Sequence, residues 1–157
     1  MKLNFIRVKN STQTPSGFTL YHDLYIKASA ELMYQAVSQP EHLINWWPLK
    51  CSGTPQVSTE YNFNFTDEYN WYGKVITAKP NEAFHIKMTK SDEDWNHTSF
   101  GFDLEAKEDH VHLKFWHSGW PNCNAHFRHS SYCWAILLHG LKSYVERGIV
   151  VPFEERN

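Results

Sequence analysis

The stretch NAHFRHSSYCWAILLHGLKSYVERG, residues 124–148, decides the fold of this chain. Steps of three and four residues pick out one narrow stripe along it, at the spacing of an amphipathic α-helix: Phe127, Ser131, Trp134, Leu138, Leu141 and Val145. The opposite face is polar, and Gly148 stands where a helix commonly ends on a left-handed residue. Some two dozen helical residues make a rod of roughly 35 Å. Because one side of that rod is apolar, we predict a long C-terminal helix that packs along a sheet.

The chain before this helix alternates apolar and polar residues in the manner of half-buried β-strands. A first strand is predicted from Phe18 to Ile26, and further strands lie between residues 61 and 117, separated by turn residues. Two short helices are predicted after the first strand, one capped by Ser29 and one that begins at Pro40 and is stopped by Pro48. The order β-α-α-β-β-β-β-β-α indicates an α+β fold.

Length and charge limit the classes of protein that fit. A chain of 157 residues is expected to form a single domain, here 1–157, in which residues 1–16 are an extension of unassigned structure. The formal net charge of −2 gives no field that would attract nucleic acid or an anionic membrane surface. No window of 18 apolar residues exists, so we expect no membrane insertion. The N-terminus does not read as a signal peptide, and we expect a cytosolic protein.

Cysteine and aromatic content add two further expectations. The three cysteines are odd in number and show no close paired spacing, which indicates reduced thiols rather than a disulfide framework: Cys51, Cys123 and Cys133. Seven tryptophans, eight tyrosines and ten phenylalanines are many for this length. Part of this set must fill the core, but wide flat side chains also suit the walls of a ligand cavity.

Several short strings resemble a known family: ASAE at 28–31, PEHL at 40–43 running into WW at 46–47, GKV at 73–75, and HSGW at 117–120. They are similar to the START-related superfamily with the helix-grip fold, and within it to the single-domain bacterial type of the family named after the activator of the heat-shock-protein-90 ATPase. The resemblance covers about residues 17–150. It implies a curved antiparallel sheet wrapped around the last helix, a cavity between the two, and binding of hydrophobic small molecules.

The same resemblance implies no catalytic constellation, so no catalytic residue is assigned. The chaperone activator that gives the family its name carries a further domain, for which this chain has no room. We therefore do not expect a chaperone partner, and a chaperone-binding interaction module is kept only as a third hypothesis.

The predicted ligand is a small hydrophobic or aromatic molecule, held in the cavity under residues 124–148. Inward-facing apolar residues and tryptophans near the ends of elements supply the shape of the cavity, and His117, Ser130 and Tyr132 supply orientation. The competing interpretation is that each of these side chains simply fills the core. The complete predicted set is Trp46, Trp47, Phe63, Phe65, Trp71, Met88, Phe100, Phe102, Phe115, His117, Trp120, Phe127, Ser130 and Trp134.

His117 carries the alternative function, because it is a titratable residue in an apolar row. A neutral imidazole there could act as an acid/base group in an enzyme of cyclase or hydrolase type. The competing interpretation is a core histidine that bonds to a nearby backbone group or to Ser130. Nucleophilic catalysis by a Cys133–His129 pair lacks a third group to orient the base.

We expect neither a metal nor another cofactor. His117, Cys123, His126 and His129 have donor atoms that zinc accepts, but their spacing matches no recognised metal pattern. The acidic run at 92–94 is interpreted as a solvated turn.

Apolar residues near the C-terminus leave two interpretations open. Ile136 projects from the polar side of the last helix, and residues 149–153 are apolar. They could form the surface of a homodimer, or the tail could fold back on its own domain.

Overall fold

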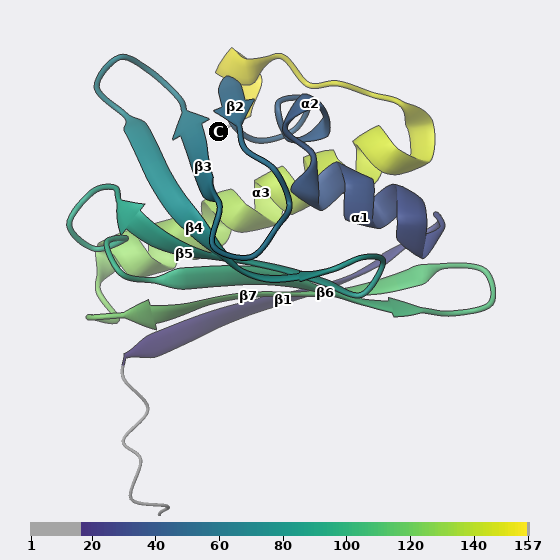
Figure 1. The fold of residues 1–157 in the computed structure, drawn as a ribbon, viewed down its shortest axis with the longest axis horizontal. Coiled ribbons are helices and arrows are strands. Elements are labelled where there is room, and N and C mark those ends of the chain that lie inside the picture. The colour runs from purple at the N-terminus through teal and green to yellow at the C-terminus, as the bar shows by residue number, and fades with distance from the viewer. Residues whose placement is uncertain (1–16, 157) are drawn as a thin grey trace, which may run out of the picture.

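The computed structural model describes residues 17–156, so the extension at 1–16 lies outside the described residues. A seven-stranded antiparallel sheet curves around one long helix, which confirms the predicted α+β helix-grip fold (Figure 1). Its spatial order is β1-β7-β6-β5-β4-β3-β2. The strands are β1 (Phe18–Ile26), β2 (Lys50–Ser52), β3 (Glu60–Asn64), β4 (Asn70–Lys79), β5 (Ala83–Lys90), β6 (Ser99–Ala106) and β7 (Val111–Trp120).

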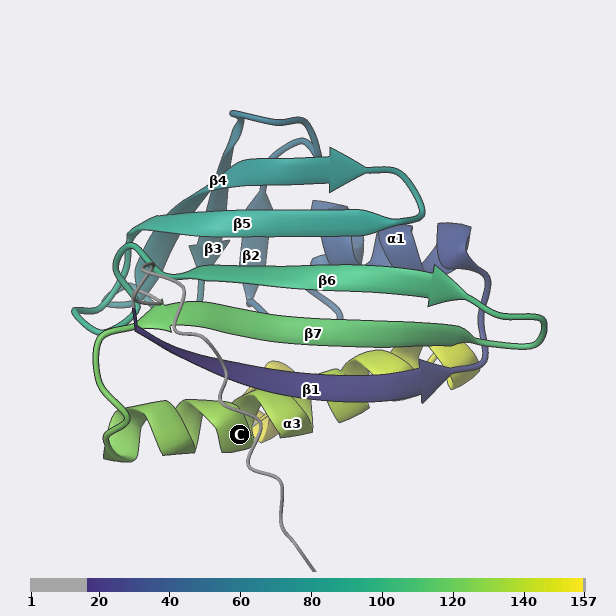
Figure 2. The same cartoon turned by 90° about the horizontal axis from the view of Figure 1, so that it is seen from below.

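The helices lie on one face of this sheet, and Figure 2 shows α3 running beneath β1 and β7. They are α1 (Ala30–Ser38), α2 (Pro40–Leu43), α3 (Ala125–Arg147) and the short 3-10 helix η1 (Phe153–Glu155). In the part of the chain described, none of these helices is both long and apolar enough to cross a membrane.

One end of α3 is fixed by a side-chain cap and the other by Gly148, the residue at which the sequence predicts the end of the helix. The Asn124 side chain caps the first turn by accepting a hydrogen bond from the Phe127 amide at 3.0 Å. Gly148 ends the helix in the left-handed region at φ 68°, where residues with a Cβ are strained. Along the helix, Trp134 and Leu138 are buried as predicted, but Ser130 is more deeply buried than its neighbour in the predicted stripe.

Two details differ from the prediction. The second helix ends at Leu43, and the chain then turns through residues 44–47. This turn lets both neighbouring indoles enter the core, with Trp46 2% and Trp47 4% exposed, whereas adjacent helical residues would point about 100° apart. The strand β2 was not predicted, because three residues are too short to show an alternating pattern.

The C-terminal tail, 149–156, folds back along α3 toward α2 (Figure 1). Arg156 anchors it: Nε donates to the Val151 carbonyl at 2.8 Å, and Nη1 donates to the Ile44 carbonyl at 3.0 Å and the Trp47 carbonyl at 3.3 Å. Of the two interpretations of residues 149–153, the structure therefore shows the tail on its own domain.

Candidate functional site

An open pocket of about 280 Å³ lies between the β3–β4 hairpin, the loop 91–98 and the N-terminal half of α3. We call it the aromatic pocket. It is lined by Trp47, Phe65, Tyr69, Trp71, Asp92, Trp95, His126, His129, Ser130, Cys133, Trp134 and Leu137.

The β3–β4 hairpin supplies one wall. The hairpin closes through the Phe65 amide, which donates to the Tyr69 carbonyl at 2.9 Å, and through the Tyr69 amide, which donates to Thr66 Oγ1 at 3.0 Å. These bonds hold the rings of Phe65 and Trp71 with centroids 5.1 Å apart at 63°. Tyr69 is 50% exposed and stands at the edge of this wall.

The loop 91–98 supplies an adjoining wall through Trp95. Its backbone amide donates to the Asp92 carbonyl at 3.2 Å and to Asp92 Oδ1 at 3.3 Å, and its carbonyl accepts from Thr98 Oγ1 at 2.6 Å. The Trp95 ring lies 4.9 Å from Trp71 and 5.8 Å from Trp134. Trp95 is 7% exposed although it belongs to a short polar loop. Trp95 was not among the predicted site residues, because no periodicity marks a single buried residue in a turn.

Five of the fourteen predicted ligand-binding residues line the aromatic pocket: Trp47, Phe65, Trp71, Ser130 and Trp134. The other nine do not line it. The ninth, Phe127, packs against Trp120 and Phe18. The remaining eight are at most 2% exposed and fill the core: Trp46, Phe63, Met88, Phe100, Phe102, Phe115, His117 and Trp120. Their burial places these side chains in the core, and Trp46 also lines a pocket under the C-terminal tail. The aromatic pocket itself lies toward the β3–β4 side of the sheet.

His117 is a core histidine with both ring nitrogens occupied. Trp134 Nε1 donates to Nδ1 at 3.1 Å, so the ring proton resides on Nε2, which donates to Thr98 Oγ1 at 2.8 Å. Thr98 in turn donates to the Trp95 carbonyl. Burial lowers the pKa of His117 to about 3. The hydrogen-bond partners of His117 are thus Thr98 and Trp134, rather than Ser130 or a backbone group. Neither ring nitrogen is left free to bond a substrate.

Polar side chains gather at the mouth of the aromatic pocket. His126 Nδ1 donates to Asp94 Oδ2 at 2.8 Å, and its Nε2 lies 3.8 Å from Asp92 Oδ2. This hydrogen bond lowers the pKa of Asp94, whereas burial raises the pKa of Asp92. His129 Nε2 lies 3.4 Å from the Cys133 sulfur, whose thiol pKa is raised by burial. The acidic run is therefore partly tied to α3 rather than being a fully solvated turn.

The side chains considered for zinc do not come together. His117 is enclosed in the core, while Cys123 is exposed and the His126 ring is bonded to Asp94. Within residues 17–156, no group of three or more histidine, cysteine, aspartate or glutamate side chains is arranged to hold a metal ion.

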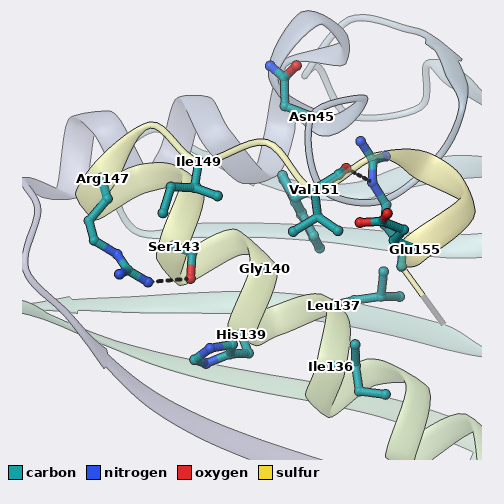
Figure 3. Close-up of a pocket in the computed structure, with 12 residues that line it drawn as sticks. Asn45, Ile136, Leu137, His139, Gly140, Ser143, Arg147, Ile149, Val151 and Glu155 are labelled. Atoms are coloured by element: carbon teal, nitrogen blue, oxygen red, sulfur yellow. Dashed lines mark hydrogen bonds between the residues drawn. The ribbon is translucent and has the colours of Figure 1, made fainter.

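A second pocket of about 250 Å³ lies on the other flank of α3, under the tail (Figure 3). Ile149 and Val151 of the tail face Gly140 and Leu137 of the helix in this view. Leu137 also lines the aromatic pocket, so the two spaces adjoin one another along α3. Tyr132 is 64% exposed and lines neither pocket.

Solved structures with the same fold include three informative neighbours. The Aha1 dimer from Colwellia psychrerythraea has a TM-score of 0.75 and 29% identity, over 83% of this chain and 98% of that one. The protein MLL2253 from Mesorhizobium loti has a TM-score of 0.74 and 19% identity, over 85% and 100% of the two chains. DynU16, described as a putative protein in the dynemicin biosynthetic locus, has a TM-score of 0.69 and 16% identity, over 83% and 48%. The last two show likeness of fold alone.

Comparison with families is more specific. No curated protein matches the chain. The model of the family described as Activator of Hsp90 ATPase homolog 1-like protein matches residues 27–146. This match spans most of the chain, including α1, the strands β2–β7 and nearly all of α3. The chain therefore belongs to the Activator of Hsp90 ATPase homolog 1-like family.

Proposed function

We propose that this protein binds a small hydrophobic or aromatic molecule in the aromatic pocket. The observation that carries the proposal is the wall of six aromatic side chains around an open space of about 280 Å³: Trp47, Phe65, Tyr69, Trp71, Trp95 and Trp134. Protein interiors are normally close-packed, so an aromatic-walled space open to solvent is the default binding site of such a fold.

The energetics favour a ligand with a large apolar surface. Burial of a ligand methylene contributes about 0.8 kcal/mol, and each well-placed aromatic contact adds about 0.5–1.5 kcal/mol beyond area burial. The rings are also held in place before a ligand arrives. Trp134 is fixed by its bond to His117 and Trp95 by the loop bonds to Asp92 and Thr98. A preorganised wall avoids the entropic cost of ordering side chains on binding.

The test uses 4-tert-butylphenol, a neutral aromatic probe of suitable size. We expect saturable binding by calorimetry, accompanied by shifts of the indole N–H signals of Trp71 and Trp95 in ¹H–¹⁵N spectra. Tyr69→Ala removes an exposed part of the wall and should weaken binding by about 1 kcal/mol, as loss of one aromatic contact does.

Tyr132→Ala is the matched control, because Tyr132 is an exposed tyrosine like Tyr69 but lines neither pocket. It should leave the affinity unchanged. If 4-tert-butylphenol and a wider panel of neutral aromatic compounds show no saturable binding, or if both variants lose affinity equally, the pocket does not have this function.

Self-association is a further proposal about partners. The Colwellia neighbour was solved as a dimer, and this chain is 29% identical to it. We infer that two copies of this chain associate, and sedimentation velocity over a hundredfold concentration range tests this; a constant monomer mass would contradict it.

The expected cytosolic location also stays a proposal, which fractionation of expressing cells tests.

A further inference from the structure

We propose that the aromatic pocket selects organic cations: a quaternary or tertiary ammonium group held against the aromatic rings and opposite the Asp92 carboxylate. This inference rests on the proposed function of the same pocket and adds the chemical class of its ligand. It follows from the arrangement of the rings and from the charges around them.

Six aromatic side chains line this one pocket together with Asp92. Several neighbouring rings are inclined to each other: Trp71 by 43° to Trp95, by 63° to Phe65 and by 86° to Tyr69. Trp47 is inclined by 57° to Phe65, whereas Trp95 and Trp134 stack at 22°. The face of each ring carries the negative part of its quadrupole, so a cation placed over the faces of these rings would be attracted to them.

The charged groups of the lining have the sign that a cation requires. Asp92 is an acidic residue of the lining. The His126 ring lies between Asp92 and Asp94, with one nitrogen facing each carboxylate. Among the described residues that line the pocket, none is a lysine or an arginine. His126 and His129 also line the pocket; His126 Nδ1 donates to Asp94, and its Nε2 lies 3.8 Å from Asp92 Oδ2. The mouth of the pocket therefore places two carboxyl groups beside an aromatic interior.

Asp92 is the group that would form an ion pair with a bound cation. Its Oδ1 accepts one long hydrogen bond from the Trp95 amide at 3.3 Å, and its Oδ2 is 3.8 Å from His126 Nε2. Partial burial raises the pKa of Asp92, and the charge of Asp94 adds to this shift, while 36% of the Asp92 side chain stays exposed at the mouth. A cation nearby would stabilise the carboxylate. A neutral ligand would desolvate the carboxylate further, and an anion would be repelled by both the carboxylate and the ring faces.

The experiment compares two molecules of the same shape. The (4-hydroxyphenyl)trimethylammonium ion and 4-tert-butylphenol differ only in a charged nitrogen in place of a carbon. Calorimetry at pH 7.5 and constant ionic strength should give an affinity for the cation about tenfold or more above that for the neutral isostere, the range expected of a desolvated cation–π site.

Two variants separate the contributions. Asp92→Asn keeps an oxygen that accepts from the Trp95 amide but removes the charge, so the cation should lose several-fold in affinity while the neutral probe loses nothing. Asp109→Asn is the control, because Asp109 is exposed in the distant β6–β7 turn and should affect neither probe.

Equal affinities for the two molecules would overturn the selectivity for cations while leaving the proposed function intact. Unchanged affinity of Asp92→Asn for the cation would also overturn the proposal. Absence of binding by both molecules would remove the proposed function together with this inference.

Discussion

Trp134 Nε1 donates a hydrogen bond to His117 Nδ1 across 3.1 Å and thereby joins the long helix α3 to strand β7 inside the core. An indole can only donate, so this bond fixes the imidazole as the tautomer with its proton on Nε2. That proton bonds to Thr98, whose own proton reaches the Trp95 carbonyl. One buried chain of hydrogen bonds thus ties helix, sheet and the pocket-forming loop together.

We expect His117→Leu to destabilise the fold rather than to abolish a reaction in an intact protein. The change leaves the buried Trp134 N–H without an acceptor, which costs about 1–3 kcal/mol, and it removes the hydrogen bond that Thr98 Oγ1 accepts, while Thr98 still donates to the Trp95 carbonyl. Urea unfolding should show a loss of about 3 kcal/mol. The control His139→Leu, at an exposed position of α3, should stay within about 0.5 kcal/mol. A stable His117→Leu protein that lacks an activity would instead support the acid/base hypothesis.

The pH dependence of stability provides a second prediction. The folded pKa of His117 is about 3, below the ordinary value of 6.5, so between these values the unfolded chain binds a proton that the folded protein does not. Stability linked to His117 is complete above pH 6.5 and is lost as pH falls toward 3, by about 1.4 kcal/mol per pH unit.

Two measurements check this dependence. The ¹⁵N signals of the His117 ring should keep the pattern of the neutral Nε2–H tautomer from pH 8 to pH 5. The difference in unfolding free energy between the wild type and His117→Gln should narrow as pH falls below 6.5, because only the wild type loses this contribution. A ring that titrates near pH 6.5 in the folded protein would contradict both expectations.

Gly140 offers a stabilising change. It lies in the middle of α3, and a Cβ added there meets nothing within 4 Å, because the position faces the second pocket (Figure 3). Gly140→Ala should raise the free energy of unfolding by about 0.5–1 kcal/mol, since alanine restricts the unfolded chain and favours the helix.

Gly101→Ala is the contrasting variant. A Cβ at this buried position of β6 would lie 2.3 Å from the Trp116 ring and 2.5 Å from the His85 ring, so both rings or the strand itself must move. We expect this substitution to destabilise the protein by about 1–3 kcal/mol in the same urea measurements. Equal effects of the two alanines would show that local space does not control these positions.

Arg156 should hold the tail closed over the second pocket. Arg156→Met keeps the apolar stem but removes the hydrogen bonds to the carbonyls of Val151, Ile44 and Trp47. Hydrogen exchange should accelerate in residues 149–156 and in the turn 44–48, and stability should fall by about 1.5–3 kcal/mol. Arg147→Met is the control, because Arg147 is exposed and bonds only to Ser143 within its own helix. Unchanged exchange in the tail of Arg156→Met would show that other contacts hold it.

The aromatic pocket was only partly predictable from the sequence. Alternation along a strand gives the side of the sheet on which a residue lies, and by that criterion Phe63 and Phe65 are equivalent. In the structure Phe63 is 1% exposed in the core, while Phe65 lines the pocket. The difference arises from tertiary packing: Phe63 is enclosed by Trp47, Tyr61 and Phe100, and no local pattern encodes such contacts. For Trp95 the local sequence indicates exposure, because it lies in a polar turn. It nevertheless forms part of the pocket wall, because its hydrogen bonds to Asp92 and Thr98 fold the loop inward.

The sequence by itself determined the fold class, because helical and strand periodicities, the Ser29 and Asn124 caps and Gly148 are local signals that act on neighbouring residues. Only the tertiary structure decided which inward residues fill the core and which surround a space. It also decided that His117 is a saturated structural group, since its partners Thr98 and Trp134 are 19 and 17 residues away in the chain. Such contacts depend on the curvature of the whole sheet around α3, a property that arises only when all elements pack together.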